Sequence, residues 1–343
     1  MKAAVLYGRE DVRIEDVKER ALQPGEVRVT IHAALTCGTD LKVYRRGYHA
    51  RMIVPPAVFG HEFAGVISEV GPEVSDWRVG ERVVAANSAP CGACRWCEAG
   101  QPNLCDDLLF LNGAYAESIV IPARLVQKNL LRLGAETSFR DAALVEPLAC
   151  VVLGVEETAL KAGERVLVLG AGPIGLMFVV LARARGCDVT VAGRRAARLA
   201  AARRLGANHV IDVGAAADLA RAIQAENGKA PDVVLEAIGK PEAWEAAVQL
   251  VRKGGRVNFF GGCPAGTTIS LDTGRIHYSG LALLASFHHT PATIRRALAL
   301  VEQGTVRAVD FVDDECELDD LPALLKSMTA GNHAVKTHVR IRR

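Results

Sequence analysis

Residues 165–175 read RVLVLGAGPIG, and this stretch decides the fold of the chain around it. Its first five residues form a compact apolar strand, its glycines follow the spacing G-x-G-x-x-G, and residues 176–185 then continue as a helix. Such glycines permit a tight turn and let a pyrophosphate approach the N–H groups of the helix N-terminus. The stretch therefore predicts a dinucleotide-binding loop made by Gly170, Gly172, Pro173, Ile174 and Gly175.

The segments that follow this loop alternate between strand and helix. Helices are expected at 195–205 and from Pro241 to Gly254, and further strands at 188–192, 209–211, 232–235, 256–260 and 281–284. Because a glycine motif alone is weak evidence, this context is what makes it specific. The alternation predicts a parallel, doubly wound sheet of α/β class over residues 143–285.

The first 140 or so residues have a different character. Residues 27–31 and 82–84 alternate at the strand period, and glycine and proline interrupt the sequence at short intervals. This pattern predicts a small barrel-like β domain with long loops. After a helix from Thr290 to Gln303, the strand-like tail 336–340 is expected to return to that domain, which then comprises 1–142 and 286–343.

Composition limits the classes of protein that the chain can belong to. Its 343 residues suffice for two domains, and a net charge of +2 gives no reason to expect a nucleic acid or an acidic membrane as partner. The N-terminus lacks the features of a signal peptide, and no apolar run is long enough to span a bilayer. Nine cysteines are then best explained by metal-bound thiols in a reducing cytoplasm.

Four of these cysteines lie within fifteen residues, in a lobe at about 88–108. Cys91, Cys94, Cys97 and Cys105 suit one tetrahedral ion, and a set of thiolates favours zinc. The alternative, four ordinary buried cysteines, fits poorly with a polar stretch rich in glycine and proline. Four protein ligands leave no open coordination position, so this zinc would be structural and catalysis must take place elsewhere.

The residues after the predicted strand 188–192 indicate which nucleotide the chain binds. An NAD site usually has a carboxylate there, whereas this chain has Gly193 followed by Arg194 and Arg195. The two guanidinium groups could bind a 2′-phosphate, which favours NADP, and Arg198 is a weaker candidate one turn later. The alternative is that both arginines are solvated charges at a helix start and that the cofactor is NAD.

Candidate ligands for a second metal ion lie upstream of the cysteine lobe. Cys37 precedes Gly38 and Thr39, and His61 is followed directly by Glu62. Thiolate, neutral imidazole and carboxylate are all zinc ligands. Taken singly, each residue could equally be a buried cysteine, a core histidine or a surface glutamate, and sequence distance does not join them.

The motif Gly60-His61-Glu62-Phe63-Ala64-Gly65, continuing to Gly71 and Val74, resembles the zinc signature of a known family. With the four-cysteine lobe, it identifies the chain as similar to the zinc-dependent medium-chain dehydrogenase/reductases of the alcohol dehydrogenase superfamily. Within that superfamily the chain is most similar to the sorbitol (iditol) and threonine dehydrogenase branch. The resemblance implies a GroES-like β-barrel catalytic domain, a Rossmann cofactor domain, one catalytic and one structural zinc per subunit, and a homodimer or homotetramer.

The resemblance also implies roles for single residues. Cys37 and His61 would bind the catalytic zinc, and Glu146 occupies the third ligand position of the family. In the polyol branch the glutamate at the position of Glu62 can bind zinc while the other glutamate holds the bound water, so the choice between the two stays open. Thr39 matches the family's hydroxyl relay for the substrate proton. Asp40 is expected to brace the loop.

The implied reaction is reversible hydride transfer between a small alcohol and a nicotinamide, in which zinc lowers the pKa of the substrate hydroxyl. We expect an NADP-linked oxidation of a secondary alcohol of a polyol, a sugar or a related molecule. The alternatives are an NAD-linked threonine-type or primary-alcohol enzyme, a zinc-independent quinone reductase and a non-catalytic relative. The last two are disfavoured because the zinc ligands are intact. His288 and His289 could line the nicotinamide end of the cleft, or sit on a loop or cap the following helix. Tyr44, Arg45 and Tyr48 could contact a hydroxylated substrate or only cover the loop after Cys37.

Overall fold

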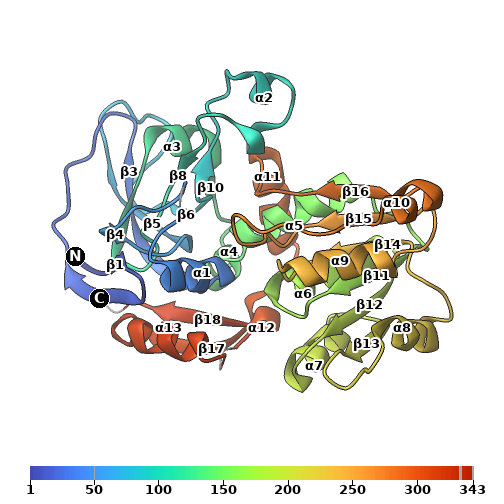
Figure 1. The fold of residues 1–343 in the computed structure, drawn as a ribbon. Coiled ribbons are helices and arrows are strands. Elements are labelled where there is room, and N and C mark those ends of the chain that lie inside the picture. The colour runs from blue at the N-terminus through green and yellow to red at the C-terminus, as the bar shows by residue number, and fades with distance from the viewer. Residues whose placement is uncertain (50, 332–333, 342–343) are drawn as a thin grey trace. The chain divides into compact units, whose positions relative to one another are not determined.

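The computed structural model describes residues 1–49, 51–331 and 334–341 and divides the chain into two compact units (Figure 1). One unit comprises Met1–Ala149 and His289–Arg343, and the other comprises Cys150–His288. The sequence placed these boundaries a few residues earlier, after 142 and after 285. The boundary between Ala149 and Cys150 lies within helix α5 (Val145–Thr158).

The second unit contains a six-stranded sheet in the order β13-β12-β11-β14-β15-β16, and every neighbouring pair is parallel. This order reverses between β11 and β14, which is the arrangement of a doubly wound dinucleotide-binding sheet. The strands are β11 (Arg165–Leu169), β12 (Asp188–Gly193), β13 (His209–Asp212), β14 (Val233–Glu236), β15 (Arg256–Phe259) and β16 (Ala282–Ala285). The predicted parallel α/β sheet is confirmed.

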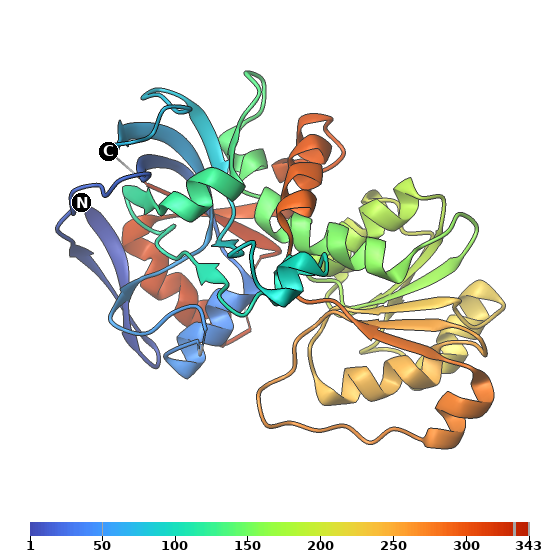
Figure 2. The same ribbon diagram turned by 90° about the horizontal axis from the view of Figure 1, so that it is seen from above.

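Helices cover both faces of this sheet. They are α6 (Pro173–Ala184), α7 (Ala196–Arg204), α8 (Leu219–Asn227), α9 (Pro241–Leu250) and α10 (Thr273–Ser279). Apolar residues of α8 and α9 pack against the sheet in one cluster, and Figure 2 shows the gold helix α9 and the yellow-green helix α6 on opposite faces. The expected end of α9 at Gly254 is wrong, because the backbone is already extended at Val251.

The first unit is built mainly from antiparallel strands. Its largest sheet has the order β10-β6-β5-β3-β18-β17, with β9 also paired to β3, and smaller sheets are β2-β1-β4 and β7-β8. The strands are β1 (Lys2–Gly8), β2 (Asp11–Asp16), β3 (Val27–Leu35), β4 (Ala57–Val58), β5 (Glu62–Val70), β6 (Arg82–Ala85), β7 (Ser88–Ala89), β8 (Leu109–Phe110), β9 (Ser118–Ile121), β10 (Leu130–Arg132), β17 (Val312–Glu317) and β18 (Lys336–Arg340). The helices are α1 (Gly38–Arg46), α2 (Arg95–Glu98), α3 (Ala123–Asn129), α4 (Phe139–Ala142), α11 (Pro291–Glu302), α12 (Ala308–Phe311) and α13 (Leu321–Thr329).

Strand pairing within this unit brings distant segments together. Leu35 at the end of β3 pairs with Glu62 at the start of β5, so residues 37 and 61 follow and precede paired positions. The tail strand β18 pairs with β3 and β17, which places Lys336 in the same sheet. No helix among the described residues is long and apolar enough to cross a membrane.

Candidate active site

Cys37, His61 and Glu62 form one compact group in the first unit. One ligand atom of each lies within 4.8 Å of the ligand atoms of the other two. Cys37 is the N-cap of α1, and the pairing of β3 with β5 places the histidine and glutamate beside it. Oε1 of Glu62 is buried and accepts no hydrogen bond from any residue described. A thiolate, an imidazole and a free carboxylate oxygen are a donor set that fits zinc.

The imidazole of His61 is held from behind by Asp40. Nδ1 of His61 lies 3.1 Å from Oδ1 of Asp40, whose Oδ2 accepts hydrogen bonds from the backbone of Cys37 at 2.9 Å and the hydroxyl of Tyr115 at 2.5 Å. Burial raises the pKa of Asp40, but the charge and hydrogen bond of His61 outweigh it and leave that pKa below its usual value. A carboxylate on Nδ1 leaves Nε2 available for a metal.

Glu62 is paired with a lysine that the sequence did not identify. Oε2 of Glu62 accepts a short hydrogen bond from Nζ of Lys336, which also donates to the carbonyl of Thr36 at 2.9 Å. Both charged side chains are fully buried. Nothing in the local pattern of β18 marks this lysine, because its partner is far away in the sequence. The expected return of the tail to the first domain was the only available signal.

Glu146 lies on α5, outside the group formed by Cys37, His61 and Glu62. Its Oε1 is 3.9 Å from Nε2 of His289, which forms a 2.9 Å hydrogen bond with Oδ1 of Asn87. Burial raises the pKa of Glu146 to about 7. Of the two glutamates left open by the sequence, Glu62 is therefore the one placed next to the cysteine and the histidine.

The remaining candidate site residues of the first unit differ in how deeply they are buried. Thr39 is half-buried on the first turn of α1, and its backbone N–H points to the sulfur of Cys37 at 3.4 Å. Tyr44 is buried in the hydrophobic core, and Arg45, which is exposed, donates to the carbonyl of Thr329. Tyr48 is exposed.

The four-cysteine lobe has the geometry of a thiolate site. The sulfur of Cys97 lies 4.0 Å from that of Cys91 and 3.6 Å from that of Cys94, which is 3.8 Å from that of Cys105. Four thiolates at about 2.3 Å from one zinc ion would lie about 3.8 Å apart. The residues present therefore fit a closed zinc site.

The lobe is tied to the rest of the unit at its base. Strands β7 and β8 pair across it, and Arg124 on α3 donates to the backbone and side chain of Asp107, at 2.8 Å each. Within the lobe, Trp96 donates to Asp106 at 3.0 Å. A backbone hydrogen bond from Asp106 is the largest of several contacts that lower the pKa of Cys94 to about 6, which favours the thiolate that a metal binds.

The glycine loop of the second unit has the backbone that an anion requires. Gly170 has a φ of +109°, and a Cβ on Gly175 would lie 1.9 Å from the carbonyl oxygen of Gly170, so helix α6 packs directly on the turn. Gly172 is the N-cap of α6, and the space where its Cβ would point is open. Pro173 and Ile174 begin the helix. This open cradle at a helix N-terminus fits a pyrophosphate.

Gly193 ends β12 directly beside the glycine loop. A Cβ at this position would lie 2.6 Å from Cβ of Ala171, so a carboxylate side chain has no room there. Arg194 and Arg195 follow, both exposed, and Arg195 is the N-cap of α7 with a φ of +75°. Arg198 is half-buried in the first turn of that helix.

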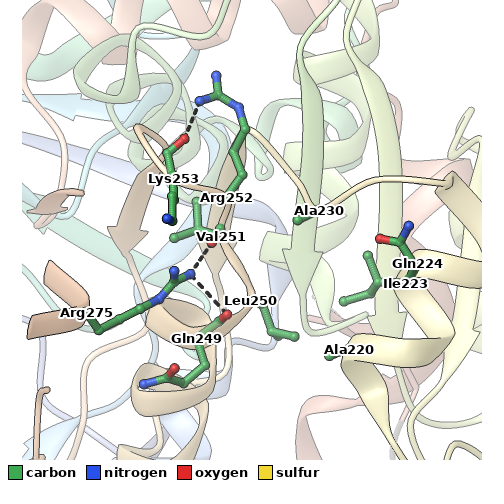
Figure 3. A pocket seen from close by; sticks show the side chains of 10 residues that line it. All are labelled: Ala220, Ile223, Gln224, Ala230, Gln249, Leu250, Val251, Arg252, Lys253 and Arg275. Carbon is green, nitrogen blue, oxygen red and sulfur yellow. Dashed lines mark hydrogen bonds between the residues drawn. The ribbon is translucent and has the colours of Figure 1, made fainter. Parts of the chain in front are cut away.

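A cavity of about 380 Å³ in the second unit contains none of these residues (Figure 3). It lies at the amino ends of β14 and β15, whereas the glycine loop lies at the carboxyl end of β11. Arg275 in its wall donates to the carbonyls of Val248 and Gln249, at 3.3 and 3.2 Å, and so caps the end of α9. These contacts give Arg275 a structural role.

Comparison with known proteins places both units in one family. The profile of the alcohol dehydrogenase GroES-like domain matches residues 23–130, and that of zinc-binding dehydrogenases matches 173–303. Sorbitol dehydrogenase of Bacillus subtilis is 30% identical, with 99% of this chain and 97% of that protein covered. L-threonine 3-dehydrogenase of Rhizobium etli (strain CIAT 652) is 30% identical, with 97% and 96% covered.

The chain belongs to the zinc-dependent medium-chain dehydrogenases. A solved zinc-binding dehydrogenase from Sinorhizobium meliloti 1021, bound to NADP, has a TM-score of 0.89 and 31% identity, with 99% of this chain and 98% of that chain covered. The GroES-like and Rossmann fold, the sorbitol- and threonine-dehydrogenase-like branch and the use of zinc and a nicotinamide dinucleotide are thereby confirmed. The protein is an oxidoreductase, and its substrate class follows from further argument.

Proposed function

We propose that this dehydrogenase is NADP-preferring and interconverts a secondary alcohol of a polyol, a sugar or a similar small molecule with the ketone. The sequence Gly193-Arg194-Arg195 at the end of β12 carries the cofactor choice. A glycine there removes the carboxylate that binds the ribose of NAD, and two exposed guanidinium groups supply charge for a 2′-phosphate. The NADP found in the Sinorhizobium meliloti relative supports this choice.

In the proposed mechanism Cys37, His61 and Glu62 hold the catalytic zinc. When bound, the metal acts as a Lewis acid that lowers the pKa of the substrate hydroxyl and polarises the ketone in the reverse direction. Asp40 fixes the orientation of His61 through Nδ1. Thr39, two residues after the ligand cysteine on the first turn of α1, would relay the hydroxyl proton of the alcohol, passing its own proton on through the cofactor ribose towards solvent. The dinucleotide, held at the glycine loop, would supply the nicotinamide that accepts the hydride of the carbinol carbon.

Lys336 sets the charge of this site. Its ammonium group is fully buried and contacts Oε2 of Glu62, which leaves Oε1 as the oxygen free to bind the metal. Glu146 is proposed to hold water near the same centre, because its carboxylate is buried and stands apart from the three ligands.

The substrate class rests on the relatives. Sorbitol dehydrogenase is named for a polyol, and L-threonine 3-dehydrogenase for oxidation at carbon 3 of a hydroxy amino acid. Both names describe oxidation of an alcohol in a small polar molecule, and both relatives match nearly the whole chain. Assembly into a homodimer or homotetramer belongs to the same proposal.

A dehydrogenase assay tests this proposal. Reduction of NADP and of NAD is followed at 340 nm with a panel of polyols, sugars, L-threonine, simple secondary alcohols and simple primary alcohols. We expect turnover of at least one polyol or sugar alcohol with a kcat/KM for NADP above that for NAD. Strong preference for NAD would contradict the cofactor assignment, and activity restricted to L-threonine or primary alcohols would contradict the substrate class.

A further inference from the structure

Glu236, the last residue of β14, is a buried carboxylate at the carboxyl edge of the second unit's sheet. Its Oε1 accepts hydrogen bonds from the backbone N–H groups of Ile238 at 2.7 Å and Gly239 at 2.9 Å. Its main-chain oxygen accepts two more, from Phe260 at 3.1 Å and Gly261 at 2.9 Å. One residue therefore ties the turn after β14 to the turn after β15.

The two turns pack on each other without room for side chains. Gly239 has a φ of +75°, and a Cβ there would lie 2.6 Å from the carbonyl oxygen of Gly262. A Cβ on Gly261 would lie 2.3 Å from the nitrogen of Gly239 and 2.8 Å from Oε2 of Glu236. Trp244 adds a 2.9 Å hydrogen bond from Nε1 to the carbonyl of Gly261. The carboxylate is thus enclosed by backbone that it holds in place.

The turn after β14 stands beside the dinucleotide loop. Ala237 donates to the carbonyl of Leu169 at 2.9 Å, and Cγ1 of Ile238 lies 3.0 Å from the position that a Cβ on Gly170 would take. The side chain of Ile238 is 43% exposed, which is unusual for a large apolar group and leaves it available to a ligand. Because strand order reverses between β11 and β14, this is the crevice in which such sheets bind ligands.

We propose that Glu236 is a positioning residue for the dinucleotide, whose carboxylate holds residues 237–239 against the glycine loop as one wall of the cofactor crevice. The inference rests on the proposed function, because the dinucleotide is the ligand. A shared acceptor on two successive N–H groups fixes the turn in a single conformation before the cofactor arrives, and preorganisation of this kind raises affinity. Without this carboxylate, part of the binding free energy of the cofactor would be spent on ordering the turn.

Oε2 of Glu236 shows what the side chain contributes. It is buried and accepts no hydrogen bond in the described part of the chain, so a single oxygen supports the turn. A glutamine can place the same acceptor at the same position, whereas an alanine cannot. Glu236→Gln should therefore keep the wall and Glu236→Ala should lose it.

The dissociation constant for NADPH is measured by titration in the absence of any alcohol. The fluorescence of NADPH reports its binding. We expect Glu236→Ala to raise the dissociation constant for NADPH about tenfold, the loss of roughly one charge-assisted hydrogen bond. Glu236→Gln should stay within about threefold of the wild-type value on the same argument. An alanine variant that folds and binds NADPH as the wild type does would overturn the inference.

Asp232 provides a matched control at the opposite end of the same strand. Its carboxylate accepts hydrogen bonds from the backbone of Arg165 at 2.7 Å and from Arg252 at 2.5 Å, far from the crevice. Asp232→Ala should lower Tm without changing the dissociation constant for NADPH. An equal loss of affinity in Asp232→Ala would show that general destabilisation is responsible and would overturn the inference.

Two further outcomes are distinguishable. If Glu236→Ala does not fold, Glu236→Met replaces it, since a side chain of similar length fills the same space but has no oxygen to accept from the two N–H groups, and wild-type affinity in that variant would overturn the inference. If the wild-type enzyme binds neither NADPH nor NADH, the proposed function itself fails. That result is separate from any difference between variants.

Discussion

Lys336 belongs to a buried ion pair, so its removal should cost stability. Its charge and that of Glu62 are both buried, and each is the other's ionic partner. Lys336→Met leaves Oε2 of this buried glutamate without its ionic partner and should lower the free energy of unfolding by about 3 kcal/mol, as measured by urea denaturation. The double variant Glu62→Gln/Lys336→Met should recover most of this loss. A single variant as stable as the wild type would contradict the pairing.

A second prediction concerns Arg194 and Arg195, which are proposed to select NADP over NAD. Arg194→Ala/Arg195→Ala should raise the KM for NADP at least about tenfold, because charge-assisted hydrogen bonds to a phosphate are lost, and should change the KM for NAD by less than about twofold. Steady-state kinetics with each dinucleotide supplies the measurement.

The same helix offers a control for this prediction. Arg203 and Arg204 are exposed at the other end of α7, so Arg203→Ala/Arg204→Ala removes the same charge without touching the predicted phosphate site. If both double variants raise the KM for NADP equally, net charge is responsible and the assignment of Arg194 and Arg195 is wrong.

At the scale of elements, the cysteine lobe is expected to brace the first unit without taking part in hydride transfer. Cys94 is the N-cap of the short helix α2, and the lobe's sulfurs are spaced for one tetrahedral ion. Cys94→Ser should reduce the zinc content from about two ions per chain to about one and lower Tm. Protein that stays folded should keep most of its kcat.

Zinc content by atomic emission, Tm and kcat of the same preparation distinguish the possibilities. A variant that keeps its Tm and both zinc ions would contradict the structural role. A variant that keeps Tm but loses kcat would place the lobe in the chemistry.

Some elements could be predicted from the sequence, and others could not for a physical reason. The buried strands of the parallel sheet are apolar runs, and the glycine loop has a spacing set by its backbone geometry. Helices α8 and α10 carry a weaker signal, because α8 fully buries only Ile223 and α10 fully buries no residue. The caps of α8, Asp218 and Gly228, mark it, together with Leu219, Ala222 and Ile223, which lie at helical spacing on its buried face.

At the scale of the whole molecule, the sequence predicts chemistry better than it predicts contacts between distant segments. The four cysteines of the lobe indicate a metal site because the ligands lie close together in the chain. Lys336 and Glu236 gain their roles only when β18 joins β5 through β3 and when β14 and β15 end side by side. Charged residues are normally exposed, so neither residue could be recognised as buried from its sequence context.

The central claim of this account is that a metal held by Cys37, His61 and Glu62 carries out catalysis, separately from the metal of the cysteine lobe. The turnover rate of His61→Ala tests it most directly, measured as NADP reduction on the best alcohol of the panel. The variant should keep about one zinc ion per chain and bind NADPH, and its kcat/KM should fall at least about a thousandfold. A folded variant with activity within about tenfold of the wild type would contradict the account.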